Sequence, residues 1–389
     1  MLSKKKSFLL SKRRLLLFFG LFILGLLGFA PPKIHDPFSA QKKFCTLDNG
    51  MRLAYVEFGN PKGRPVILLH GYTDTGRSFE RVAEHLLDRD RKLRIIIPDL
   101  RGHGASSMPT DSICSISPKD CFQITDFGGD VVRLMAHLRV DKAHIAGHSM
   151  GSMVAQHLAI FHPEKVEGIT LIATVAVGGS SPVLQEFILG ELIDKKFRLA
   201  AESFGLAWPR DAYRIAPEAL GEHVADYLIS NWVTESVADS SLLKAIGKET
   251  VRVNLGTWVG TALGIQEFDY RKELEKLQVP TLILSAVQDP VPHQVPDETD
   301  LFPALDAACR SKNTVIYHKL YGRDGNAHSE RLDLGHNFLW AVPEYVAADI
   351  LSFMNSNAPQ QNHTYLNEDG AVVTESSTRN ILKWPRVRP

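Results

Sequence analysis

A serine between two glycines lies at the junction of a strand pattern and a helix pattern, and this feature restricts the fold most. The sequence Gly147-His148-Ser149-Met150-Gly151 matches G-x-S-x-G. Residues 143–146 indicate a buried strand, and the apolar-rich residues 152–161 indicate a helix. This strand–turn–helix arrangement is typical of a nucleophile elbow, where a strained serine lies at a helix N-terminus that favours developing negative charge. Ser149 is therefore a candidate nucleophile; the plain alternative is a solvent-exposed serine in a glycine-rich turn.

Short apolar, β-branched runs alternate with helix-period segments along most of the chain. Such runs suit strands that are buried on both faces of a parallel sheet, with helices as crossover connections. The turn Asn49-Gly50 predicts a hairpin ahead of them, and apolar stripes near residues 127–138 and 343–353 indicate two of the helices. The predicted fold class is α/β, with a mostly parallel central sheet flanked by helices. The predicted strands are residues 66–69, 93–97, 143–146, 169–175, 281–286 and 314–320.

The strand pattern lapses between about residues 177 and 277. This stretch has a helical pattern and is rich in aromatic residues, which predicts an inserted helical cap rather than more sheet. For any single aromatic side chain, plain core packing is the simpler interpretation. The predicted domains are a basic stretch with a signal anchor or signal peptide (1–35), a first core part (40–176), the cap (177–277), a second core part (278–355) and a polar C-terminal tail (356–389).

A second motif, His70-Gly71-Tyr72, follows the predicted strand 66–69. A strand that ends beside the serine can supply a backbone donor for a developing oxyanion. We assign the two donors of this oxyanion hole to the backbone N–H groups of Tyr72 and Met150. His70 is expected to order the loop rather than to exchange protons. His148 either shapes the pocket beside the serine or is a packed histidine at a strand end.

A third motif, Asp99-Leu100-Arg101-Gly102-His103-Gly104-Ala105-Ser106, has glycines that permit tight turns, and we interpret it as structural. With all three motifs in order, the sequence resembles the α/β-hydrolase superfamily, in the branch with H-G, D-x-R-G-x-G-x-S and G-x-S-x-G motifs. The resemblance covers about residues 45–355. That branch includes esterases, lactonases, cofactor-free haloperoxidases and carbon–carbon bond hydrolases. The resemblance therefore implies the α/β-hydrolase fold and a helical lid after the sixth strand, but it does not specify a substrate, and it implies no metal or organic cofactor.

The resemblance also implies that the nucleophile is followed along the chain by an acid and then a histidine. Asp289 lies at the end of the predicted strand 281–286, and the alternative location for the acid, residues 175–185, contains no Asp or Glu. Gly335-His336 precedes the last predicted helix and matches the family's G-H loop, and His328 is the remaining alternative. The expected triad is Ser149, Asp289 and His336. The span from Asp289 to His336 is longer than usual in the family.

The first 30 residues differ from the rest of the chain. They hold six Lys or Arg and no acidic residue, and residues 15–30 are an unbroken apolar or glycine run. Sixteen residues fall short of the roughly 20 that cross a membrane easily, so the run is expected to be either a short uncleaved transmembrane anchor or a cleaved signal peptide. A buried core helix is the plain alternative. The positive flank keeps the N-terminus cytoplasmic and puts the catalytic body in the periplasm, in a lumen or at the cell surface; after cleavage it would be secreted.

Cys114 and Cys121 lie in one polar loop. They are a candidate disulfide, which would suit an extracytoplasmic body, and two unpaired loop thiols are the alternative.

These features predict a serine hydrolase that cleaves a carboxylic ester, with an apolar or lipid-like group, and whose partners are a small-molecule ester and a membrane. The same triad would also serve a perhydrolase resembling the haloperoxidases or a carbon–carbon bond hydrolase. The alternative of another class is a catalytically inert, membrane-tethered ligand-binding module. Beyond residue 30 the chain has a mild excess of acidic residues, which argues against nucleic acid as a partner. The sequence leaves the oligomeric state open.

Overall fold

The computed structural model describes residues 36–235, 238–286, 288–291, 300–312, 314–321, 334–359, 364–366, 372–375 and 377–380. The predicted signal anchor or signal peptide, in residues 1–35, lies outside these ranges. Within them, no helix has the length and hydropathy that a membrane span needs. The chain divides into two compact units, Met1–Ala40 and Gln41–Pro389. The described part of the first unit is a short helix, α2 (Pro37–Ala40), capped by the Asp36 carboxylate.

The second unit is built on a large sheet, which in the described part of the chain has nine strands in the order β1-β2-β4-β3-β5-β6-β7-β8-β11. The strands from β4 to β8 in this order pair in parallel, while β1 and β2 at one edge and β11 at the other pair antiparallel. The predicted fold class is confirmed. The strands are β1 (Lys43–Thr46), β2 (Arg52–Gly59), β3 (Arg64–Leu69), β4 (Leu93–Pro98), β5 (Ala143–His148), β6 (Val166–Ile172), β7 (Thr281–Ala286), β8 (Ile316–Tyr321) and β11 (Ser377–Asn380).

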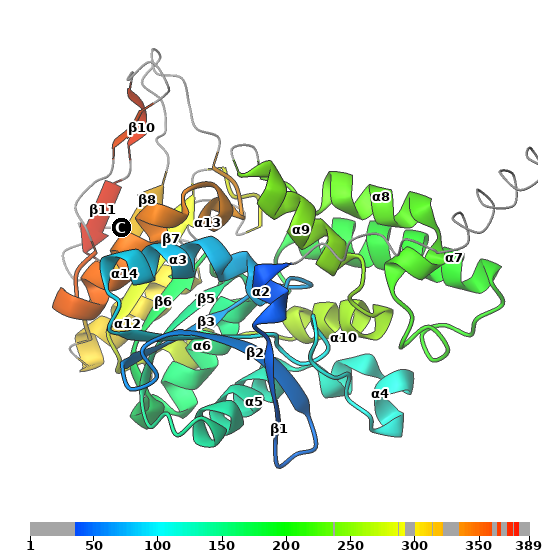
Figure 1. Cartoon of the computed structure of the whole chain (residues 1–389), viewed down its shortest axis with the longest axis horizontal. Helices are drawn as coiled ribbons and strands as arrows, with labels where there is room; N and C mark the ends of the chain where they lie inside the picture. The colour runs from blue at the N-terminus through cyan, green and yellow to red at the C-terminus, as the bar shows by residue number, and fades with distance from the viewer. Residues whose placement is uncertain are drawn as a thin grey trace, which may run out of the picture. The chain divides into compact units, whose positions relative to one another are not determined.

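Helices cover both faces of this sheet, which is why every residue of β5 and β7 is buried. Helices α3 and α14 pack together on one face, and α5 and α6 pack together on the other (Figure 1). The helices and helical turns outside the predicted cap are η1 (Gly76–Phe79), α3 (Glu80–Arg89), α4 (Ser112–Ile116), η2 (Pro118–Cys121), α5 (Ile124–His137), α6 (Met150–Phe161), η3 (Pro163–Lys165), α12 (Leu301–Lys312), α13 (Phe338–Ala341) and α14 (Pro343–Ser356).

Strand β6 ends earlier than the sequence predicts, at Ile172 rather than at residue 175. The next residue, Ala173, has a φ of 52°, which is a left-handed conformation that breaks the strand. The chain then turns so that the Thr174 hydroxyl accepts hydrogen bonds from Ser152 and Gln156 of α6, at 2.7 and 2.8 Å. These bonds fix the helix that carries the serine turn against the neighbouring strand.

The described residues between β6 and β7 form helices and turns, together with one isolated bridge between Val177 and Asp269. Trp258, at the centre of this region, is fully buried and contacts the rings of Tyr72, Phe197 and Trp232 edge-on or tilted. The aromatic residues therefore serve the packing of this region as well as lining space beside the sheet. Its elements are η4 (Val183–Phe197, a π-helix), α7 (Arg198–Ser203), η5 (Pro217–Leu220), α8 (Glu222–Asn231), α9 (Ser240–Thr250), α10 (Leu255–Gln266) and α11 (Arg271–Leu274).

Two features of the second unit concern the loop cysteines and the C-terminus. A disulfide joins Cys114 to Cys121 with a Cα–Cα distance of 5.6 Å, and the turn η2 that carries Cys121 packs against α10. The segment expected to be a tail contains β11, which pairs antiparallel with β8, and a two-stranded ladder of β9 (Thr364–Leu366) and β10 (Val372–Glu375). Each of these strands has only three or four residues, which is too short for a hydrophobic alternation in the sequence to indicate it.

Candidate active site

The serine of the G-x-S-x-G motif occupies a sharp turn between β5 and α6. Ser149 has φ 51° and ψ −119°, a conformation that costs a non-glycine residue about 1–3 kcal/mol. Its N–H donates to the carbonyl oxygen of Ile172 at 2.9 Å, which holds the turn in place. A Cβ on Gly147 would lie 2.1 Å from the Gly151 carbonyl oxygen, and a Cβ on Gly151 would lie equally close to that of Leu69. Both positions therefore require glycine, and Ser149 is held at the first turn of α6.

Asp289 and His336 meet beyond the ends of the central strands. Asp289 follows β7, and His336 lies in the loop before α13. Nδ1 of His336 is 2.9 Å and 3.0 Å from the two carboxylate oxygens of Asp289, and the carboxylate also accepts the N–H of Val291 at 2.9 Å. Since a carboxylate only accepts, Nδ1 carries the hydrogen, and Nε2 is left as the basic nitrogen of the neutral ring. His328, the alternative histidine, lies outside the described residues.

The charge around His336 decides how readily it holds a proton. Burial, the largest single cause, lowers the pKa of His336, but the charge and hydrogen bond of Asp289 together with the charges of Asp74 and Glu235 outweigh it. The pKa of His336 is therefore raised overall. A base of this kind accepts a proton from a hydroxyl more readily than an isolated imidazole does.

The two residues assigned to an oxyanion hole flank the serine turn. Tyr72 lies just after β3, and Met150 is the first residue of α6, where backbone N–H groups have no partner within their own helix. The Tyr72 hydroxyl donates to the carbonyl oxygen of Trp258 at 2.7 Å, which ties this loop to α10. Thr73, the next residue, has a φ of 59°, unusual for a β-branched side chain, so the loop is strained as well as tethered.

The remaining motif residues support these loops. His70 is buried; its Nε2 accepts the N–H of Leu100 at 2.9 Å, and its Nδ1 lies 2.9 Å from the Gly71 carbonyl oxygen. Burial lowers the pKa of His70 to about 4, so the ring is neutral and cross-links two loops. The Asp99 carboxylate accepts the N–H of Gly76 at 2.9 Å and pairs with Lys42 at 2.7 Å. These contacts agree with the structural roles expected for both motifs.

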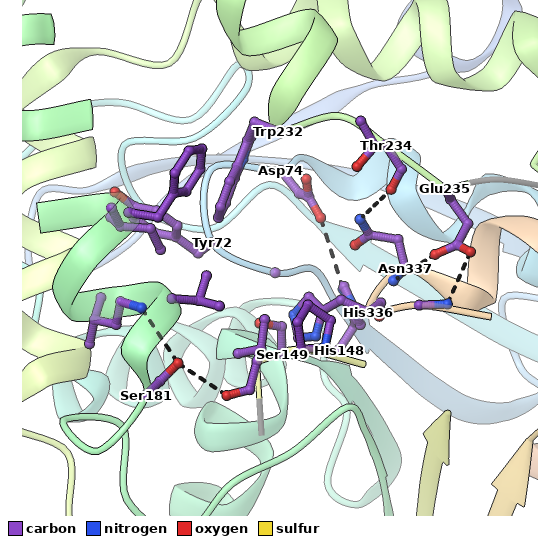
Figure 2. A pocket seen from close by; sticks show the side chains of 18 of the residues that line it. Tyr72, Asp74, His148, Ser149, Ser181, Trp232, Thr234, Glu235, His336 and Asn337 are labelled. Atoms are coloured by element: carbon purple, nitrogen blue, oxygen red, sulfur yellow. Dashed lines mark hydrogen bonds and ion pairs between the residues drawn. The ribbon is translucent and has the colours of Figure 1, made fainter. Parts of the chain in front are cut away.

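Ser149 and His336 line one cavity of about 810 Å³, which lies between the carboxyl ends of the central strands and the helices that follow β6 (Figure 2). Its walls are mostly apolar, and the helical region contributes most of them. A wall of this composition favours an apolar ligand, while polar groups that converge at one end fix its orientation. The apolar side chains that line the cavity include Met153, Val175, Leu184, Phe187, Ile188, Trp232, Leu243 and Ile265.

Glu235 holds the histidine loop and was not predicted as a functional residue. Its carboxylate oxygens accept the N–H groups of Gly335 and Asn337, at 3.1 and 3.2 Å, which are the residues on either side of His336 (Figure 2). The Asn337 side chain also donates to the Thr234 carbonyl oxygen at 3.1 Å. The region between β6 and β7 therefore holds the loop of His336 in place through direct hydrogen bonds. The sequence around Glu235 has no motif that would have indicated this contact across 100 residues.

Asp74 and His148 are two further polar residues in the cavity wall (Figure 2). Both are buried, and Nδ1 of His148 lies 3.9 Å from the Asp74 carboxylate. Burial raises the pKa of Asp74 to about 7, although the Ser78 hydroxyl and His336 act to lower it. His148 fits both interpretations left open for it, since it is a packed histidine at the end of β5 and it also lines the cavity. Asp74 lies four residues after His70, but no sequence motif indicated it as a residue of the site.

Comparison with known proteins agrees with this architecture. A family model described as "alpha/beta hydrolase fold" matches residues 64–308, well over half of the chain, so the chain belongs to this family and is a hydrolase. The 3-oxoadipate enol-lactonase 2 of Acinetobacter baylyi is 25% identical over 242 residues, which cover 61% of this chain and 76% of that protein. A proline iminopeptidase of Lactobacillus helveticus is 27% identical over 229 residues, 58% of this chain and 74% of that protein.

Solved structures show the same fold. The crystal structure of a membrane phospholipase A aligns with 88% of this chain and 99% of its own, with a TM-score of 0.59 and 20% identity. At this level of identity the alignment shows a shared fold and no more.

Proposed function

We propose that the chain is a serine hydrolase that cleaves a carboxylic ester through an acyl-enzyme on Ser149. One observation supports this most strongly. Ser149, in its strained turn, and His336 line the same cavity, while Nδ1 of His336 is hydrogen-bonded to Asp289. This is the combination of nucleophile, base and orienting acid that acyl transfer requires.

In the proposed reaction, the Ser149 hydroxyl attacks the ester carbonyl while His336 takes its proton. The N–H groups of Tyr72 and Met150 stabilise the oxyanion. His336 then protonates the departing alcohol, and Asp289 holds the imidazole tautomer and stabilises its charged form. Water, deprotonated by His336, cleaves the acyl-enzyme and releases the acid.

The proposed substrate is an ester with a large apolar group, such as a lipid-like acyl chain. The size and apolar walls of the cavity support it, and the enol-lactonase among the relatives is consistent with attack on an ester bond. Hydrolysis of 4-nitrophenyl esters of increasing acyl length by the full chain tests this, with Ser149→Ala as control. We expect kcat/KM to rise with chain length and Ser149→Ala to lose activity. A preference for acetate would contradict the apolar substrate, and full activity of Ser149→Ala would contradict the mechanism.

The alternative functions give different results in the same assays. A perhydrolase would form a peracid when hydrogen peroxide competes with water for the acyl-enzyme, and a carbon–carbon bond hydrolase would leave all simple esters intact. An inert binding module would bind esters without turning them over. We favour hydrolysis because the strained serine and the paired histidine would have no purpose in a protein that only binds its ligand.

We also propose that residues 1–30 tether the hydrolase to a membrane, with the body on the extracytoplasmic side. The support is the row of basic residues followed by the apolar run 15–30, and the disulfide between Cys114 and Cys121 suits that side. Carbonate extraction of membranes from expressing cells tests the tether. We expect the full chain to stay in the pellet; release into the wash, or a mature protein that begins after residue 30, would contradict it and favour secretion.

A further inference from the structure

One side chain of the helical region both lines the cavity and contacts the loop that carries the proposed oxyanion donor. Trp232 lies directly after helix α8, and its half-buried ring forms part of the apolar cavity wall beside Tyr72 (Figure 2). Its indole N–H donates to the hydroxyl of Thr73 at 2.9 Å, across 159 residues of sequence. Trp232 therefore connects the space for an apolar group with the residue next to Tyr72.

The Thr73 hydroxyl extends this contact to the backbone of Tyr72. Because the hydroxyl accepts a hydrogen from Trp232, its own hydrogen is available, and it donates to the Tyr72 carbonyl oxygen at 2.7 Å. The Thr73 N–H, in the same peptide group, donates to Nε2 of the buried His103 at 3.3 Å. Both polar groups of the peptide that joins Tyr72 to Thr73 are thus hydrogen-bonded, one of them through the hydroxyl that Trp232 orients.

Thr73 has a backbone conformation that needs such support. Its φ of 59° is unfavourable for a β-branched residue, and the residue is fully buried. A strained conformation of this kind persists only where the surrounding contacts over-determine it. Without the bond from Trp232, the Thr73 hydroxyl would lose the contact that orients it, and the peptide after Tyr72 would be freer to move. The Tyr72 N–H would then be less well placed to stabilise an oxyanion.

The contents of the cavity affect how firmly the Trp232 indole is held. Its bond to Thr73 is only partly buried, so water in an unfilled cavity can compete for the indole N–H. An apolar group that fills the cavity excludes this water and packs against the ring. Because an N–H without a partner is costly in apolar surroundings, the indole is then held on Thr73.

We propose that Trp232 is a positioning residue that couples the apolar cavity to the oxyanion loop. An acyl group long enough to reach its ring secures the hydrogen bonds from Trp232 through Thr73 to Tyr72, so the oxyanion donor is best placed when the cavity is filled. The preference for apolar acyl groups is then expressed in kcat and not in KM alone, because part of the binding energy is used in the transition state. The inference rests on the proposed ester hydrolase function and describes how its substrate controls that site.

Separate values of kcat and KM for 4-nitrophenyl esters from acetate to octanoate test the coupling. With the full chain, we expect kcat to rise by about 5- to 10-fold along the series, which is the effect of one secured hydrogen bond, while KM falls. The acyl group occupies the cavity both when the acyl-enzyme forms and when water cleaves it, so the expectation holds whichever step limits kcat. This measurement needs no variant. A kcat that is the same for all esters, with all discrimination in KM, would overturn the coupling.

Trp232→Phe removes the N–H and keeps an aromatic ring in the cavity wall. For the octanoate ester its kcat should fall by about 5- to 10-fold, and kcat should no longer depend on acyl length, while KM still decreases with length. The matched control is Trp208→Phe, in the same helical region but at a separate groove, and it should leave kcat and KM unchanged. A length-dependent kcat that survives in folded Trp232→Phe, or that Trp208→Phe also abolishes, would contradict the role of Trp232.

A double-mutant cycle separates positioning through Thr73 from the packing of the Trp232 ring. Thr73→Val removes the hydroxyl and keeps the branched shape, so it should lower kcat as Trp232→Phe does, and the double variant should be no slower than either single variant. Thr73→Ser retains the hydroxyl and should keep the kcat of the parent. If the two losses multiply in the folded double variant, Trp232 does not act through Thr73, and the proposed route is wrong.

A failure of the coupling is distinguishable from a failure of the proposed function. Esters hydrolysed with a constant kcat, by a protein whose Ser149 reacts with a fluorophosphonate, would overturn the coupling and leave the hydrolase. A protein that hydrolyses none of the esters and does not react with the probe would overturn the proposed function, and the coupling with it.

Discussion

The carboxyl ends of the central strands and the helices between β6 and β7 contribute different kinds of residue to the same cavity. Ser149, Asp289 and Tyr72 each follow a central strand, and each lies in a turn fixed by the backbone. The helices contribute mainly apolar side chains such as Leu184 and Phe187. The nucleophile, the acid and one oxyanion donor therefore lie at the carboxyl ends of central strands, and His336 lies in the loop before α13. The helical region supplies most of the apolar wall of the cavity.

Glu235 is the exception, and it shows how the two regions are connected. It belongs to the helical region but hydrogen-bonds the backbone on both sides of His336. The helical region thus both shapes the cavity and holds the base. The predictions below separate these contributions, beginning with the largest effect.

The largest loss of activity is expected from a substitution at the end of a central strand. Asp289→Asn should lower kcat by about 10⁴-fold, because an amide in place of the carboxylate favours the wrong tautomer of His336 and no longer stabilises its charged form. Steady-state hydrolysis of the best ester measures this, with circular dichroism to show that the variant is folded. A folded variant that loses less than about tenfold would mean that another residue serves as the acid.

A smaller loss of activity is expected when the contact between the helical region and the loop of His336 is weakened. Glu235→Gln replaces one acceptor with a donor that opposes a backbone N–H, so the loop of His336 should shift, and kcat should fall by about 10- to 100-fold with little change in KM. Glu222→Gln, an exposed carboxylate of α8, is the matched control and should not change kcat. If both variants behave like the parent, the helical region does not position the base.

The pH dependence of activity tests the effect of the Glu235 charge on His336, and the expected change is smaller than the loss of kcat above. Since His336 must be neutral to take the serine proton, kcat/KM should rise with pH through the pKa of His336, which lies above its ordinary value of 6.5. The charge of Glu235 helps to raise this pKa, so Glu235→Gln should shift the midpoint to lower pH and retain activity further into acid. A midpoint that moves to higher pH would contradict the electrostatic role.

The smallest effect on activity is expected at the disulfide. Replacing Cys114 and Cys121 by serine opens a short loop, which should lower the free energy of unfolding by about 2–3 kcal/mol. Turn η2 packs on α10, and neither cysteine lines the cavity that contains Ser149, so activity below the melting temperature should be unchanged. Thermal unfolding with and without reductant measures the first part, and a loss of ester hydrolysis in the folded variant would contradict the second.

How much of this could be predicted from the sequence differs between the two regions. The α/β fold follows from apolar runs and glycine-bounded turns, which are local signals, and the same signals mark Ser149. Asp289 and His336 could be assigned only with the residue order and G-H loop that the family resemblance implies. The helical region carries no comparable motif, so only its helical character could be predicted. Glu235 and Asp74 gain their importance from contacts with loops far away in the sequence, and no local pattern encodes such contacts.

The central claim is that Ser149 is an activated nucleophile, and its reaction with a fluorophosphonate probe tests this most directly. The parent protein and Ser149→Ala would be treated with the probe, and the modified residue would be located by peptide mass spectrometry. We predict a phosphonyl group on Ser149 of the parent and none on the variant. A folded parent that does not react, or that reacts at a residue other than Ser149, would contradict the account.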